Sequence, residues 1–247
     1  SWKHKLCNTI VGAARMLKPE LTHILQTVIE SKETRGNAPY TLLCSHMLQN
    51  SFQAGEIWHA LPTLAIDIAK LFWLGDSTGI DTEDMDYYRR ETDIYGLRDH
   101  LNHKYYPSSA FQSPVLKFLN TNPKYALPFI IELFNTVTEA YVQEYKNKYT
   151  TDPNTIQIHI SEGFECTQVC NGQLWAMYRG MSAGPHLLES ILMALERWLD
   201  TCITTLPSVA AVAICKHLLQ ESKSVAITAV VLSMVMAHPD KLFEIAC

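Results

Sequence analysis

The segment PHLLESILMALERWLDT, residues Pro185 to Thr201, decides the fold class. Large apolar side chains recur through it at spacings of three and four, namely Leu188, Ile191, Leu192, Leu195, Trp198 and Leu199. That spacing places them on one face of an α-helix. Pro185 suits the first turn, where no backbone N–H is required. The segment therefore predicts a long helix with one buried face.

Similar segments follow toward the C-terminus. Pro207–Gln220 and Ser224–Ala237 are apolar on most faces, the links between them are short, and Pro239 opens another helix. The run VAITAVVLSMVMA, from Val225 to Ala237, is shorter than the roughly 20 residues that span a bilayer, so we expect a buried helix. These features predict stacked helical pairs, irregular and HEAT- or armadillo-like. The alternative is a single irregular helical bundle.

Toward the N-terminus the helical period also dominates. We expect helices at Lys5–Leu17, Pro19–Ser31, Pro39–Asn50, Pro62–Leu74, Ser113–Asn120 and Leu127–Lys146. The period changes to alternation at Thr155–Ile160, which predicts a strand, and Phe164–Val169 could pair with it as a hairpin. The predicted fold class is therefore mainly all-α, with one small β-hairpin near residues 155–169.

The chain divides into three predicted parts. Residues 1–75 form an N-terminal helical block, residues 76–109 an acidic, tyrosine-rich surface excursion, and residues 110–247 a C-terminal helical block that includes the hairpin. We expect one compact unit. Because no Met stands at position 1 and the apolar pattern still runs at Cys247, we also expect it to be a piece of a longer chain.

Composition excludes several classes of protein. The 247 residues are 47% hydrophobic with only 10 Gly and 11 Pro, which excludes a disordered or collagen-like chain. The net charge is −5, and no basic stripe typical of nucleic-acid binding is visible. An odd seven cysteines without framework spacing, and an N-terminus without a secretory signal, predict a cytoplasmic location. We expect neither a nucleic-acid nor a membrane partner.

The net negative charge is concentrated in one segment. Between Asp76 and Asp99 there are eight acids and three bases, while the rest of the chain carries 17 of each. Acids and aromatic anchors together suit a basic protein surface, so we predict interaction residues at Asp81, Glu83, Asp84, Asp86, Tyr87 and Tyr88. The alternative is a solvated insertion whose tyrosines pack on neighbouring helices.

One sequence matches a catalytic motif. Gly180-Met181-Ser182-Ala183-Gly184 fits G-x-S-x-G, the nucleophile elbow of serine hydrolases, and Asp200 with His217 or His238 would complete a triad. An elbow requires a strand before the serine, so Leu174–Tyr178 would have to be one. The alternative is a glycine-rich loop that precedes a helix, and no repeated strand–helix pattern indicates the parallel sheet of a hydrolase.

A second candidate is a zinc site. Cys166 and Cys170 would share a strand face, and His159 lies close in sequence. A structural zinc site usually needs two ligand pairs, and a second cysteine pair is missing. The alternative is two small buried side chains. We therefore expect no cofactor in this chain, and we expect Trp58, Trp73, Trp175 and Trp198 to be core residues rather than binding platforms.

Two stretches resemble a known family. The segments LWAMYRG (174–180) with LLESILMALERWL (187–199), and SVAITAVVLSMVMAHPDK (224–241), resemble very large bacterial ATP-binding proteins of the antiviral STAND NTPase type, the AVAST group among them. The resemblance implies a helical region beside an NTPase core. No phosphate-binding motif G-x-x-x-x-G-K-[ST] occurs here, so the resemblance transfers no catalytic residue.

These observations predict a function without chemistry of its own. We expect a non-catalytic helical scaffold or protein-interaction region of a large cytoplasmic bacterial NTPase-type protein. The resemblance implies that the parent chain is an ATPase in anti-phage defence. Its partners would be other domains of that parent chain or another protein. The alternative function is a serine hydrolase that uses Ser182.

Overall fold

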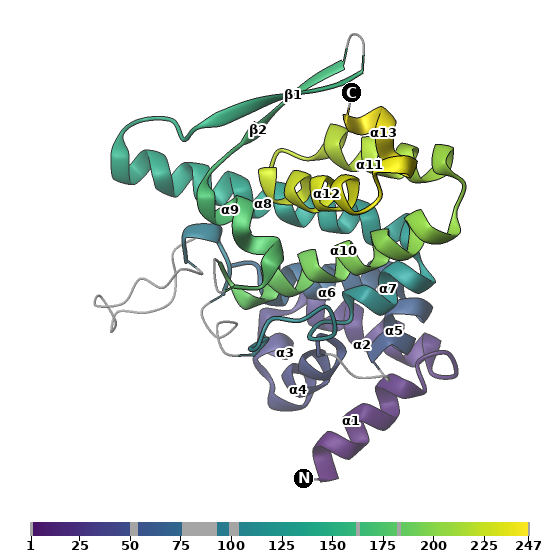
Figure 1. Cartoon of the computed structure of the whole chain (residues 1–247). Coiled ribbons are helices and arrows are strands. Elements are labelled where there is room, and N and C mark those ends of the chain that lie inside the picture. The colour runs from purple at the N-terminus through teal and green to yellow at the C-terminus, as the bar shows by residue number, and fades with distance from the viewer. Residues whose placement is uncertain are drawn as a thin grey trace.

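The computed structural model describes residues 2–49, 54–75, 93–98, 104–161, 164–181 and 184–246. Within these ranges it contains thirteen α-helices and one two-stranded antiparallel hairpin, so the predicted fold class is confirmed (Figure 1). Helices α8 and α10 cross the middle of the molecule. The N-terminal helices lie on one side of them, and the C-terminal helices with the hairpin lie on the other.

The N-terminal helices are short and separated by capping residues. They are α1 (Trp2–Gly12), α2 (Lys18–Glu30), α3 (Lys32–Gly36), α4 (Ala38–Met47), α5 (Ala54–Ala60) and α6 (Pro62–Trp73). Ser31 ends α2 and begins α3, because its hydroxyl accepts a hydrogen bond from the amide of Thr34 at 3.1 Å. Prolines stand in the first turns of α2, α4 and α6, as the sequence indicated.

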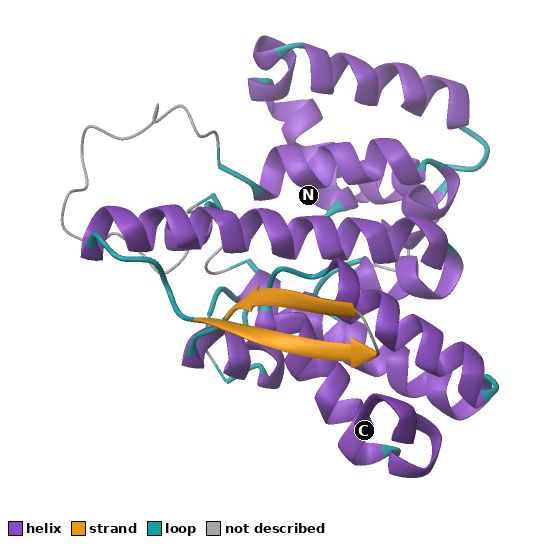
Figure 2. Ribbon diagram, turned by 90° about the horizontal axis from the view of Figure 1, so that it is seen from above, coloured by secondary structure: helices purple, strands orange, loops and turns teal. Residues whose placement is uncertain are grey.

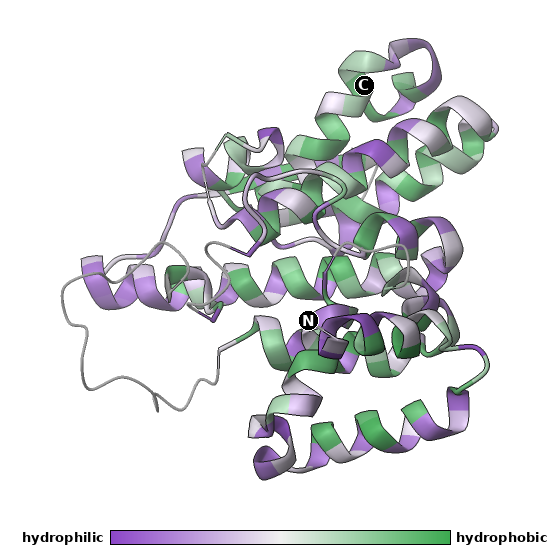
Figure 3. Cartoon of the chain, turned by 90° about the horizontal axis from the view of Figure 1, so that it is seen from below, coloured by the Kyte–Doolittle hydropathy of each residue, from purple (hydrophilic) through white to green (hydrophobic). Residues whose placement is uncertain are grey.

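The remaining elements follow from residue 93 onward. They are a 3₁₀ turn η1 (Asp93–Tyr95), helices α7 (Val115–Thr121) and α8 (Pro123–Tyr149), strands β1 (Thr155–Ser161) and β2 (Phe164–Val169), helix α9 (Gly172–Ala176), a 3₁₀ turn η3 (Met177–Arg179), and helices α10 (His186–Thr205), α11 (Ser208–Glu221), α12 (Val225–Ala237) and α13 (Pro239–Ala246). Most helices alternate between hydrophilic and hydrophobic residues along their length (Figure 3).

The N-terminal half holds an aromatic core, defined here as Trp58, Trp73, Tyr105, Phe118 and Phe129. All five side chains are at most 1% exposed, and their rings contact one another in tilted, stacked and edge-on pairs. Their polar atoms form hydrogen bonds: Trp58 Nε1 donates to the carbonyl of Met47 at 2.8 Å. Trp73 Nε1 donates to Tyr105 Oη at 2.9 Å, and that hydroxyl donates to the carbonyl of Leu48 at 3.0 Å.

The C-terminal half holds an aliphatic core between α10 and α12, made of Leu188, Ile191, Leu192, Leu195, Leu199, Ile227, Val230 and Val231, all fully buried. Helix α12 is buried on almost every side, as its uniform apolar composition indicated. Leu195 and Trp198 lie in the core as expected, but Trp175 is 42% exposed, so its expected core position is wrong. Trp175 projects from α9, a helix of only five residues, which is too short to bury every side chain.

The hairpin lies across the helices, as Figure 2 shows from above. Thr155 pairs with Val169, and the register continues to His159 opposite Glu165, with a shift between His159 and Ser161. One side chain, that of Gln168, fastens the sheet to two helices. Its Nε2 donates to the carbonyl of Leu219 in α11 at 3.1 Å, and its Oε1 accepts from Thr228 Oγ1 in α12 at 2.5 Å.

Candidate functional site: a groove beside helix α8

A surface groove of about 440 Å³ lies between α8 and the end of α11. Its apolar lining, called here its apolar floor, consists of Pro128 and Ile131, and the other lining residues are polar side chains of α8, α11 and the connection that follows α11. A volume of this size is within the range of ligand-binding clefts.

One asparagine holds the two walls of the groove together. Asn135 of α8 donates from Nδ2 to the carbonyl of Glu221 at 2.9 Å and accepts at Oδ1 from the amide of Lys223 at 2.8 Å. Glu221 is the last residue of α11, and Lys223 belongs to the connection between α11 and α12. The side chain therefore satisfies backbone groups at the end of a helix, which would otherwise lack partners, and it fixes this connection against α8.

The charges in the groove are unevenly compensated. Glu132 pairs with Lys70 at 2.5 Å, and Glu139 pairs with Lys223 at 2.6 Å. The carboxylate of Glu221 has no hydrogen bond or ion pair within the described part of the chain, and His217 precedes it by one helical turn. The groove thus presents an apolar floor beside one uncompensated carboxylate, which favours a ligand that carries a positive charge.

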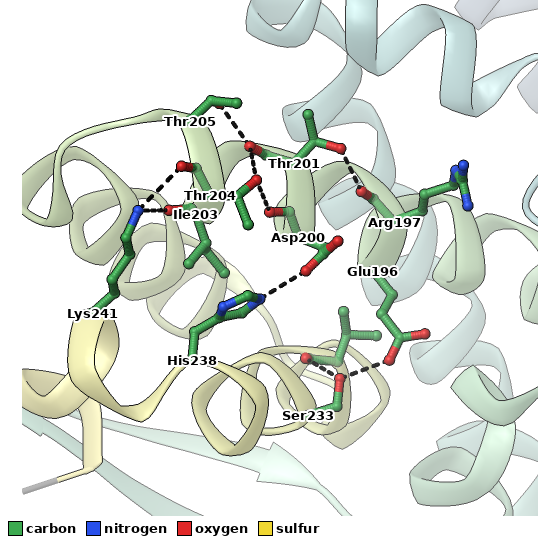
Figure 4. Close-up of polar contacts among 11 residues, drawn as sticks. Glu196, Arg197, Asp200, Thr201, Ile203, Thr204, Thr205, Ser233, His238 and Lys241 are labelled. Atoms are coloured by element: carbon green, nitrogen blue, oxygen red, sulfur yellow. Dashed lines mark hydrogen bonds and ion pairs between the residues drawn. The ribbon is translucent and has the colours of Figure 1, made fainter.

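The structure brings together one pair of the hydrolase hypothesis, Asp200 and His238, while Asp200 and His217 form no hydrogen bond or ion pair among the described residues. Asp200 bonds to His238 Nε2 at 2.7 Å within a polar network that joins α10 to α12 and α13 (Figure 4). Asp200 lies fourteen residues beyond His186 on α10, so about 20 Å along the helix separates it from the loop that precedes α10. His217 lies in the groove on α11, and Ser182 lies outside the described residues.

The local fold around the motif also differs from an elbow. An elbow would require a strand at Leu174–Tyr178, and this segment instead forms α9 and η3. Asn171 begins α9 by accepting a hydrogen bond from the amide of Leu174 at 2.6 Å. Gly180 has φ of +64°, and a Cβ at Gly184 would lie 2.5 Å from Met177 Cε. Both glycines therefore have structural roles in a turn before a helix.

The zinc hypothesis fails on side-chain direction. His159 is opposite Glu165 on the exposed face of the hairpin, with Nδ1 and Oε1 3.0 Å apart. Cys166 lies on the other face, where its thiol donates to the carbonyl of Leu219 at 3.3 Å. His159 and Cys166 therefore cannot hold the same ion, and Cys170 is half-buried beyond the end of β2. No group of three or more metal-binding side chains occurs among the described residues.

A cluster that sequence reasoning missed joins three chemistry-bearing side chains. Ser108 Oγ donates to Glu189 Oε2 and lies 2.9 Å from His186 Nδ1, which is itself 3.3 Å from the same carboxylate. The serine and the carboxylate both approach one imidazole nitrogen, whereas a catalytic triad places them on opposite nitrogens. Because Glu189 is fully buried near the start of α10, the cluster fastens the residue-108 loop to that helix.

Burial also makes three of the cysteine thiols poor candidates for a catalytic nucleophile. Burial raises the pKa of the Cys44 thiol and that of the Cys215 thiol to about 12 in each case. Both thiols are therefore protonated at neutral pH and are poor nucleophiles. Burial raises the pKa of the Cys166 thiol as well, which agrees with its role as a hydrogen-bond donor inside the hairpin contact.

The predicted interaction residues Asp81, Glu83, Asp84, Asp86, Tyr87 and Tyr88 lie outside the described residues. The flanking tyrosines Tyr95 and Tyr105 are buried: Tyr95 stacks on Tyr141 of α8, and Tyr105 belongs to the aromatic core. Sequence reasoning missed the groove, because Asn135 and Glu221 are 86 residues apart. The available signal was His217 four residues before Glu221, a spacing that puts both on one helical face.

No family model matches the chain, and no curated protein is similar to it. Among the described residues, no helix is both long and apolar enough to cross a membrane.

Proposed function

We propose that this chain is a non-catalytic helical scaffold that binds a basic segment of a protein partner in the groove beside α8. The observation that carries the proposal is the uncompensated carboxylate of Glu221 beside the apolar floor of Pro128 and Ile131. A lysine or arginine side chain would place its charged head against Glu221 and its aliphatic stem on that floor.

The neighbouring ion pairs support selectivity for such a segment. Lys70 and Lys223 already neutralise Glu132 and Glu139, so the attraction is concentrated at Glu221. Because Asn135 fixes the connection that follows Glu221, the wall is preorganised, and less conformational entropy is lost on binding.

The test uses a short amphipathic peptide in which lysine and leucine alternate at helical spacing. Isothermal titration calorimetry should show binding to the full 247-residue chain that weakens with added salt. Glu221→Lys should lower the affinity at least about tenfold. Glu30→Lys is the matched control, because Glu30 is an exposed carboxylate on α2, away from the groove. Equal losses in both variants, or no binding by the wild type, would contradict the proposal.

The wider setting of the scaffold rests on the resemblance to STAND-type proteins. The resembling residues 174–180, 187–199 and 224–241 lie in α9, η3, α10, α12 and the start of α13. On that basis the parent protein is a large cytoplasmic bacterial NTPase, as in anti-phage defence, and the partner is another of its domains. The full open reading frame tests this setting: a phosphate-binding loop upstream supports it, and a frame that encodes only this chain contradicts it.

A further inference from the structure

Strand β1 has an open outer edge. Within the described residues the sheet contains only β1 and β2, and no other segment pairs with β1. The edge of β2 is partly occupied instead, because the amide of Val169 donates to the carbonyl of Lys223 at 2.9 Å. The hairpin projects at the top of the molecule in Figure 1, and Thr155, Gln157 and His159 are all exposed.

The hydrogen-bond alternation identifies the backbone groups at this edge. The amide of Cys170 donates to the carbonyl of Asn154 at 2.8 Å, so residues 154 and 170 form a hydrogen-bonded pair. Pairs of this kind recur at every second residue of an antiparallel ladder. Residues 156 and 158 therefore face β2, and the N–H and C=O groups of Thr155, Gln157 and His159 point outward from the sheet.

The sequence of β1 is nearly the same in both directions. In Thr-Ile-Gln-Ile-His-Ile-Ser, Ile158 is the centre, with isoleucine two positions away on each side, a polar side chain one position away and a hydroxyl residue at each end. If two copies pair antiparallel about Ile158, Gln157 of each copy faces His159 of the other. The backbone N–H and C=O groups of Gln157 and His159 point outward, so in this register Gln157 of one copy and His159 of the other form a hydrogen-bonded pair. The isoleucines of both copies then lie on the same face of the sheet.

The edge lacks two of the usual protections against pairing, lysine and proline. Natural edge strands carry lysine or proline, or are very short. Strand β1 has seven residues with neither, and the register shift between His159 and Ser161 lies toward the tip, beyond the central residues. We propose that β1 pairs antiparallel with β1 of a second copy of this chain, centred on Ile158, to form a continuous four-stranded sheet. This inference concerns another surface and does not depend on the groove.

Two proline variants test the edge. Gln157→Pro removes an outward N–H of β1 and leaves the bonds between β1 and β2 in place, because proline is tolerated at such edge positions. Thr167→Pro is the matched control. Thr167 is opposite Gln157 and is also exposed, and its backbone N–H points away from β1, toward the other edge of the sheet. Sedimentation equilibrium should show a wild-type dimer, a dissociation constant at least about tenfold higher for Gln157→Pro, and little change for Thr167→Pro.

Two charge variants test the register. Gln157→Lys with His159→Lys places lysine opposite lysine in the dimer and should make the chain monomeric. Gln157→Glu with His159→Lys differs only in the sign of the charge at position 157, and it places glutamate opposite lysine, which should preserve the dimer. Circular dichroism confirms that each variant keeps its helices. A monomeric wild type, equal effects of the two proline variants, or equal dimerisation of the two charge variants would overturn the proposal.

Discussion

The aromatic core of the N-terminal half and the aliphatic core of the C-terminal half bury their side chains equally well but by different means. Trp58, Trp73 and Tyr105 bring polar atoms into the interior, and each of these atoms has a hydrogen-bond partner distant in sequence. The packing of α10 against α12 is made by aliphatic side chains that require no such partner. Aromatic burial therefore fixes how segments are placed, whereas aliphatic burial requires only the right periodicity.

The largest expected effect comes from truncating the centre of the aromatic core. Trp58→Ala removes the ring that contacts Trp73, Phe118 and Phe129, and should lower the free energy of unfolding by about 3–5 kcal/mol in urea denaturation. Trp175→Ala is the matched control, because that ring is 42% exposed, and it should stay within about 0.5 kcal/mol. A loss at Trp58 no larger than that of the control would show that the aromatic core is not stabilising.

The aliphatic core should respond to truncation with a similar but more variable loss. Leu195→Ala leaves a cavity on the buried face of α10 and should cost about 2–5 kcal/mol, depending on how far the neighbours relax. Leu6→Ala, at a leucine that is 49% exposed on α1, gives the baseline for the same change. If Leu195→Ala and Leu6→Ala unfold at the same urea concentration, the buried face of α10 does not stabilise the chain more than an exposed leucine does.

Deleting one hydroxyl group tests the feature that distinguishes the two cores, namely the buried hydrogen bonds of the aromatic core. Tyr105→Phe leaves Trp73 Nε1 and the carbonyl of Leu48 without their buried partner, so the free energy of unfolding should fall by about 1–3 kcal/mol. Tyr106→Phe removes the same atom from a neighbouring side chain that is 66% exposed, and it should have almost no effect. Equal values for the two variants would mean that the hydrogen-bond relay does not stabilise the aromatic core.

The smallest expected effect is a pH dependence beside the aromatic core. Burial, and then the charges of His4 and Lys104, lower the pKa of His46, whose Nε2 lies 2.9 Å from His4 Nδ1. The unfolded chain therefore takes up a proton near pH 6.5 before the folded chain does. Stability should be fully present above that pH and should fall as the pH decreases below it.

The measurement is the unfolding free energy between pH 7.5 and pH 5. His46→Gln should make this profile flatter on the acid side, because position 46 then no longer takes up a proton on unfolding. An acid slope that is the same in the wild type and in His46→Gln would assign the pH dependence to other groups.

The sequence predicted the helices of the C-terminal half because each has a clear start. Pro185 and Pro207 are the N-cap residues of α10 and α11, Pro239 is the first residue of α13, and Ser224 caps α12 by accepting from the amide of Ala226. The hairpin was predicted for a similar reason, since its alternation contrasts with the helical period around it. Local signals were sufficient wherever neighbouring residues determine the structure.

Prediction failed where distant contacts decide. The groove needs Asn135 to meet Glu221, and the cluster of Ser108, His186 and Glu189 needs a loop to meet α10. Neither contact produces a periodic pattern in the sequence, because the residues that meet are far apart in the chain. The two glycines of the G-x-S-x-G motif have structural roles in the turn before α10, which the motif pattern alone does not reveal.

The single amide of Gln168 has a consequence for the order in which the chain folds. Its two partners lie 51 and 60 residues further along the chain, and both must be in position before this buried side chain can be satisfied. A hairpin that docked earlier would bury an amide without partners, at a cost that opposes the step. We therefore expect the hairpin to join after α11 and α12 have packed, in which case Gln168→Ala should speed unfolding and leave the folding rate unchanged.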